Sequence, residues 1–123
     1  MSNVSIVLIS HSSKVVEGIK EIITQVNDTV SIGLAGGTDD GKIGTSVEKI
    51  QTAIDSVSSD KGVLLVYDLG SAKMNGEMAI ELGDLEKVQI LEAPILEGAY
   101  VAAVEAGMGK DIDAVLKAVE KNF

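Results

Sequence analysis

Two short, uninterrupted apolar runs place the strongest constraint on how this chain of 123 residues can fold. They are Ile6-Val7-Leu8-Ile9 and Val63-Leu64-Leu65-Val66-Tyr67, and both have the length and β-branched content of strands. Because neither run alternates with polar residues, each strand must be buried on both faces, as in a parallel sheet that helices cover on both sides. Apolar residues at helical spacing follow each run. The sequence therefore predicts an α/β fold with right-handed crossovers.

Similar segments extend this alternation along the whole chain. Strands are expected at 6–9, 30–34, 63–67 and 88–91, and helices at about 15–26, 47–57, 72–82, 95–106 and 112–119. Thr45 and Glu48 fit a capping box for the second helix, and Asp111 fits the N-cap of the last. No composition shift marks a boundary, so residues 1–123 are interpreted as one domain. The predicted fold is a flavodoxin-like open parallel sheet of order 2-1-3-4 with helices on both faces. In this order, strand 1 lies beside strand 3.

His11 is the only histidine, and it follows the first buried run directly. Open α/β sheets bind ligands at the carboxyl ends of their strands. Asp68 follows the run at 63–67, and neighbouring strands lie about 4.8 Å apart. Its carboxylate is therefore expected to accept a hydrogen bond from one ring nitrogen, which leaves the other nitrogen's lone pair free as a nucleophile towards phosphorus or carbon. The alternative is a polar turn histidine beside an aspartate that caps the third helix.

Several small residues near these two side chains are candidates for binding an anion. Ser12 begins the first helix, and Gly70 and Ser71 begin the third, so two helix N-termini with free N–H groups converge on His11. The loop at 36–44, which contains Gly37 and Thr38, offers further backbone N–H donors. Ordinary serine capping and a flexible connection are the alternatives.

The same loop partly matches the sequence motif of a nucleotide-binding site. It satisfies the pattern G-x-x-x-x-G-K, but Ile43 occupies the position where a Walker A loop needs Ser or Thr to hold magnesium. Asp39 and Asp40 would also repel the phosphates of a nucleotide. No ATP site, and no other cofactor, is expected on this chain.

Composition excludes several other classes of function. The formal net charge is −9, which argues against binding to nucleic acid or an anionic membrane and favours a basic protein partner. There is no cysteine, and the acidic residues lack the spacing of a calcium loop, so no metal site is expected. Met1-Ser2-Asn3 shows no signal-peptide pattern and the apolar runs are too short to span a membrane, so a cytoplasmic protein is expected.

The segment from Ile95 to Val104 predicts self-association. It reads as a helix that is apolar nearly all round, and a small domain cannot bury every side of such a helix. We therefore expect a second subunit to cover part of it, as in a twofold homodimer. The alternative is that an alanine-rich face is tolerated at the surface.

Three motifs together indicate a family. They are Ser10-His11-Ser12, the loop from Gly37 to Ser46, and Val66-Tyr67-Asp68-Leu69-Gly70-Ser71. Over essentially its whole length the chain resembles the phosphotransferase subunits (DhaM) of bacterial dihydroxyacetone kinases. These subunits are related to the mannose-type enzyme IIA domains of the phosphoenolpyruvate:sugar phosphotransferase system.

The resemblance implies a phosphohistidine relay. His11 would accept a phosphoryl group from the phosphocarrier HPr and pass it to ADP bound on the DhaL subunit, for phosphorylation of dihydroxyacetone held by DhaK. Asp68 would lie beside the histidine, and Gly37, Thr38 and Ser71 would face the phosphate. Some relatives carry fused HPr-like and enzyme I-like domains, and the chain as it ends at Phe123 has none, so a separate HPr is the expected donor. Two alternatives stay open: a regulatory or scaffold module without turnover, and a small-anion binding protein.

Overall fold

The computed structural model describes residues 3–83, 85 and 87–123. Four parallel strands form one sheet in the order β2-β1-β3-β4, which confirms the predicted topology. The strands are β1 (Ser5–Ser10), β2 (Ile32–Gly36), β3 (Val63–Tyr67) and β4 (Val88–Ile90). Met1 and Ser2, on which the expectation about a leader partly depends, lie outside the described residues.

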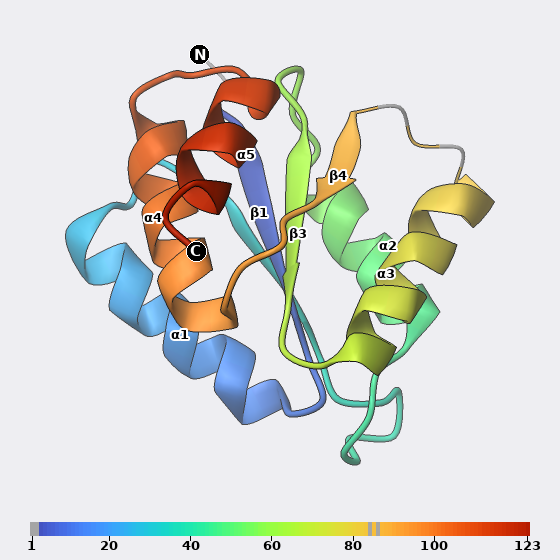
Figure 1. Ribbon diagram of the computed structural model, residues 1–123. Helices are drawn as coiled ribbons and strands as arrows, with labels where there is room; N and C mark the ends of the chain where they lie inside the picture. Colours follow the sequence, from blue (N-terminus) through green and yellow to red (C-terminus); the bar gives the residue numbers. More distant parts are fainter. Residues whose placement is uncertain (1–2, 84, 86) are drawn as a thin grey trace.

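Helices cover both faces of this sheet, as Figure 1 shows. On one face lie α1 (Ser13–Val26), α4 (Ile95–Gly107) and α5 (Ile112–Glu120), and on the other lie α2 (Val47–Ser56) and α3 (Gly70–Gly83). No helix in the described part of the chain is long and apolar enough to span a membrane. The loops that follow β1, β2 and β3 meet at one edge of the sheet, at the bottom of Figure 1.

The two central strands divide their side chains between two cores because successive residues of a strand point to opposite faces. Ile6 and Leu8 of β1 pack with α1, α4 and α5, whereas Val7 and Ile9 pack with α2 and α3. Every residue of β1 is buried. This explains why the run at 6–9 shows no polar alternation.

Small residues let α4 lie close against the sheet. Its buried residues are Gly98, Ala99, Ala102, Ala103 and Ala106. Its larger Leu96 and Tyr100 point outward and keep 36% and 37% of their surface exposed. The suggestion that the alanine-rich face lies at the surface is therefore wrong, because that face is the one the sheet buries.

The starts of β2 and α3 and the cap of α2 are among the features that differ from the sequence predictions. β2 begins at Ile32 instead of residue 30, since its pairing with β1 runs from Ile32 opposite Ile6 to Gly36 opposite Ser10. α3 begins at Gly70 rather than near residue 72. The N-cap of α2 is Ser46, whose hydroxyl accepts from the Lys49 N–H at 3.2 Å, so the capping box at Thr45 is wrong. Thr45 instead accepts a hydrogen bond from the Asn75 side chain, whereas the Asp111 cap is confirmed.

Candidate functional site

The parallel pairing of β1 with β3 brings His11 beside Asp68. Ile9 lies opposite Tyr67 in the register, so the residues that follow each strand leave the sheet at the same level. The Asp68 N–H donates to the Ile9 carbonyl at 3.2 Å, and the Gly44 N–H donates to the His11 carbonyl at 2.9 Å. The backbone on both sides of the histidine is therefore held by hydrogen bonds.

The Asp68 carboxylate accepts four hydrogen bonds. Oδ2 accepts from the Ser10 hydroxyl at 2.8 Å and the His11 N–H at 3.0 Å. Oδ1 accepts from His11 Nδ1 at 3.1 Å and the Leu69 N–H at 2.7 Å. Partial burial alone would raise the pKa of Asp68, but the hydrogen bonds from His11, Ser10 and Leu69 outweigh it and lower the pKa below its usual value. Asp68 is therefore an anion at neutral pH.

An ionised carboxylate can only accept hydrogen bonds, so Nδ1 of His11 must carry the proton that it shares with Asp68. In the neutral ring, Nε2 is then the nitrogen with the lone pair. It lies 2.7 Å from Oγ of Ser71, whose hydroxyl donates to it. The His11 side chain is 22% exposed. The structure thus presents a basic nitrogen with a fixed tautomer to the solvent.

The first residues of α3 complete the exposed side of the site. Ser71 and Gly70 occupy its first turn, where N–H groups have no acceptor within the helix and the dipole favours an anion. Neither of these two N–H groups donates a hydrogen bond to any of the residues that the structure describes. The N-terminus of α1 contributes less, because the Ser12 N–H already donates to Oγ of Ser10 at 3.1 Å.

The glycine loop lies beside His11, but the N–H groups predicted to face a phosphate already have acceptors. The Gly37 N–H donates to the Ser10 carbonyl at 3.1 Å, and the Thr38 N–H donates to the Lys42 carbonyl at 2.9 Å. A Cβ atom at Gly36 would lie 2.7 Å from Cα of Ser13, which is too close. Glycine is therefore required at this position, where the turn after β1 packs against the end of β2. The loop packs and closes on itself, and binding of phosphate by Gly37 and Thr38 stays a prediction.

Ser10 is a site residue that sequence reasoning missed. It is fully buried, donates to Asp68 and accepts from the Ser12 N–H, so one hydroxyl joins the carboxylate to the turn after β1. The available signal was a polar residue at the end of a doubly buried strand, which is costly unless its hydroxyl has partners.

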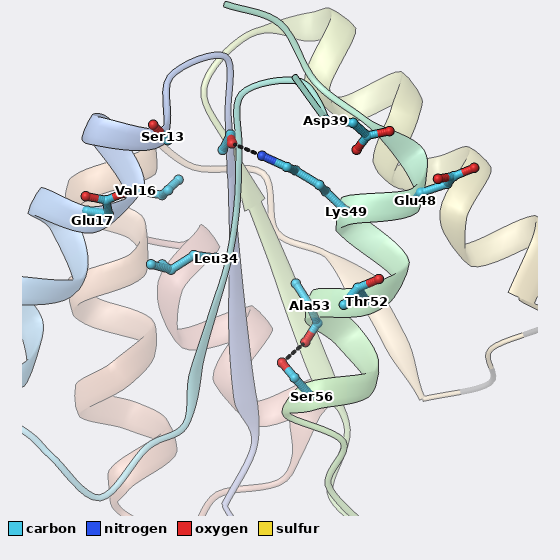
Figure 2. A pocket seen from close by; sticks show the side chains of 11 residues that line it. Ser13, Val16, Glu17, Leu34, Asp39, Glu48, Lys49, Thr52, Ala53 and Ser56 are labelled. Atoms are coloured by element: carbon cyan, nitrogen blue, oxygen red, sulfur yellow. Dashed lines mark hydrogen bonds between the residues drawn. The ribbon is translucent and has the colours of Figure 1, made fainter. Parts of the chain in front are cut away.

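A hollow of about 470 Å³ lies beside this site rather than in it, between α1 and α2 along the open edge of β2 (Figure 2). His11, Asp68 and Ser71 do not line it. Nζ of Lys49 reaches across it and donates to the Gly36 carbonyl at 3.0 Å, which occupies an acceptor of the edge strand. Among the described residues, no three His, Cys, Asp or Glu side chains gather as a metal site would need.

Comparisons with known proteins show which family the chain resembles in sequence and fold. Residues 5–116 match the EIIA-man family, described as the PTS system fructose IIA component. Two relatives from Listeria innocua, named phosphoryl donor subunits DhaM of PEP-dependent dihydroxyacetone kinases 1 and 2, are 47% and 42% identical. The alignments cover 94% and 93% of this chain, and 94% of each relative. A crystal structure of EF1359, a protein of unknown function, superposes with a TM-score of 0.87 at 33% identity, over 98% of this chain and 95% of that one.

Proposed function

Because the chain belongs to the EIIA-man family, and within it to the DhaM phosphoryl donor subunits, we propose that it is a phosphohistidine relay centred on His11. The observation that carries this proposal is that the two ring nitrogens of His11 have different hydrogen-bond partners. Asp68 holds the proton on Nδ1, and Nε2 faces outward with its lone pair beside Ser71. Such an imidazole needs no further base to attack phosphorus.

The relay consists of two transfers at the same nitrogen. In the first, the Nε2 lone pair forms a bond to the phosphorus of the phosphorylated donor carrier, HPr, and the donor's own bond to phosphorus breaks with its electrons returning to the donor. The His11 ring then carries positive charge, which the Asp68 carboxylate stabilises. In the second, ADP bound on the DhaL subunit attacks the same phosphorus and the electrons return to Nε2. The final acceptor would be dihydroxyacetone held by DhaK.

The start of α3 is suited to hold the transferred group. Phosphoryl transfer depends mainly on positioning and on stabilising charge on the equatorial oxygens. The N–H groups of Gly70 and Ser71 have no acceptor among the described residues, and the Ser71 hydroxyl, which donates to Nε2, can turn to an oxygen of the phosphoryl group once Nε2 is phosphorylated. The N–H groups of Ser12, Gly37 and Thr38 would contribute only after their present hydrogen bonds exchange.

Exposed apolar side chains beside His11 support contact with a protein donor. Leu69 and Met74 expose 59% and 68% of their surface, and both lie in or next to the first turns of α3. Exposed apolar groups of this kind often mark interaction sites. Together with the net charge of −9, they favour a docking face on HPr that is apolar at its centre and basic at its rim.

Transfer from phosphorylated HPr tests the relay. The chain is incubated with phosphoenolpyruvate, enzyme I and HPr, and its intact mass is measured. We expect one added phosphoryl group on the wild type and none on His11→Gln. An unlabelled wild type would rule out the relay and leave the scaffold or anion-binding alternatives, and a label that survives His11→Gln would place the chemistry elsewhere.

The outward side of α1 and α4 supports the further proposal of a homodimer. Ile22 and Val26 expose 50% and 61% of their surface, and Leu96 and Tyr100 lie nearby on α4. Ile22, Leu96, Tyr100 and Val101, together with Glu97, line a hollow of about 310 Å³ whose exposed surface is apolar. Light scattering should give a dimer for the wild type and a monomer for Ile22→Lys. A monomeric wild type at micromolar concentration would contradict the proposal.

A further inference from the structure

A single carboxylate, that of Glu92, ties together the two chain segments that hold the His11 ring. Glu92 follows β4. Its Oε2 accepts a hydrogen bond from the Tyr67 hydroxyl at 2.5 Å, and its Oε1 lies 2.6 Å from Nζ of Lys73. The Glu92 backbone is itself anchored, because its N–H donates to Oε2 of Glu120 on α5 at 3.1 Å. The carboxylate therefore connects the ends of β3 and β4 with α3.

The two partners of Glu92 are close neighbours of the two residues that contact the imidazole. Tyr67 immediately precedes Asp68, which holds Nδ1. Lys73 lies two residues beyond Ser71, which contacts Nε2. We propose that Glu92 is a positioning residue for phosphoryl transfer, whose carboxylate fixes the distance between Asp68 and Ser71 and so the orientation of the His11 ring between them. The proposal rests on the relay function of His11.

The protonation states of Glu92, Tyr67 and Lys73 match the contacts among them. Hydrogen bonds from Lys73 and Tyr67 lower the pKa of Glu92, so its carboxylate is ionised. The hydrogen bond to Glu92 raises the pKa of the Tyr67 phenol and that of the Lys73 ammonium, so both keep their protons. Each group therefore stays in the state that the contacts require throughout the neutral pH range.

The position of α3 depends strongly on hydrogen bonds and ion pairs, because the helix buries only small residues. The residues that it buries are Ala72, Gly76 and Ala79, which allow a close approach to the sheet but do little to fix the rotation of the helix. Polar contacts near its start do this instead. Lys73 reaches Glu92 on one side, and Asn75 donates to Thr45 on the other. A shift of the helix would move Ser71 away from Nε2. Rates of group transfer are sensitive to displacements of about 1 Å.

The test compares Glu92→Gln with Glu81→Gln, a control that removes an exposed carboxylate from α3. Single-turnover transfer from phosphorylated HPr, thermal unfolding, and the ¹⁵N chemical shifts of the His11 ring are measured for both variants. We expect Glu92→Gln to slow transfer by about three- to tenfold. We also expect ring shifts that move away from the pattern of a single Nδ1–H tautomer, whereas Glu81→Gln should match the wild type in both.

A double variant separates positioning from general destabilisation. If Glu92 acts through Tyr67, then Tyr67→Phe combined with Glu92→Gln should be no slower than Glu92→Gln alone. Equal rates and unchanged ring shifts in Glu92→Gln would overturn the proposal. So would a slower rate with unchanged ring shifts and a matching fall in melting temperature. If the wild type itself is not labelled, the relay fails instead, and the ring shifts still decide whether Glu92 orients His11.

Discussion

The two nitrogens of the His11 ring have opposite surroundings. Nδ1 faces a carboxylate at the end of a buried strand, and that carboxylate is fixed by four hydrogen bonds. Nε2 faces one hydroxyl on the exposed first turn of α3. In the proposed relay, this difference gives separate tasks to the two sides of one ring, because the proton must stay in place on one side while a phosphoryl group arrives and departs on the other. A symmetric environment could not do both.

Asp68→Asn is expected to have the largest effect on this division. The amide cannot stabilise positive charge on the phosphorylated ring, and its N–H groups conflict with the donors that now converge on the carboxylate. We expect single-turnover transfer to fall by at least about a hundredfold. Asp60→Asn, which changes an exposed aspartate, is the matched control. A wild-type rate in Asp68→Asn would show that Asp68 does not set the tautomer.

Ser71→Ala changes only the Nε2 side and should cost less. The first-turn N–H groups of α3 remain, so we expect transfer to slow by about tenfold with little change in stability. Ser71→Thr keeps the hydroxyl and should recover most of the rate. If Ser71→Ala and Ser71→Thr are equally slow, the hydroxyl has no role and the backbone alone serves the phosphoryl group.

Ser10→Ala tests the support behind the Nδ1 side. It removes one donor to Asp68 and leaves the Ser12 N–H without its acceptor, so the free energy of unfolding should fall by about 1–2 kcal/mol. Chemical denaturation measures this change. Ser5→Ala provides the control, since Ser5 is also buried in β1 but lies at its opposite end. Equal losses in both variants would mean that the effect belongs to the strand rather than to the site.

The pH dependence of stability gives the smallest expected effect. The pKa of Asp68 in the folded chain lies below its usual value, so its contribution is fully present above about pH 4, where the unfolded carboxyl is also ionised. The contribution is lost as the pH falls through the lowered folded pKa. The stability difference between wild type and Asp68→Asn should thus shrink as the pH falls below about 4. A difference that already shrinks at pH 6 would contradict an ionised Asp68.

The adjacency of His11 and Asp68 could be predicted from sequence because it depends on strand order alone. Two buried runs imply neighbouring central strands, and each run ends on one of these residues. Tyr67, Lys73 and Glu92 could not be predicted in the same way. Their contacts depend on how far α3 is rotated and where the segment after β4 runs, and the chain has 19 acidic residues among which nothing singles out Glu92.

The hydrogen bonds of the glycine loop could not be predicted from the sequence for a related reason. A glycine-rich sequence shows that N–H groups are accessible to a close neighbour, but it does not show which neighbour takes them. The Gly37 N–H donates to the Ser10 carbonyl, and the Thr38 N–H donates to the Lys42 carbonyl. The choice between Thr45 and Ser46 as the cap of α2 likewise depended on where the loop turns, which single-residue preferences do not resolve.

The separation of the site residues along the chain has a consequence for biosynthesis. His11 directly follows β1 and is synthesised before its partners, since Asp68 and Ser71 follow 57 and 60 residues later. An incomplete chain that ends before the third strand carries the histidine without the carboxylate that fixes its proton, and without the helix that faces Nε2. If the proposed relay holds, competence for phosphorylation appears only with the assembled sheet, and phosphorylation of His11 then reports that β1 and β3 have paired.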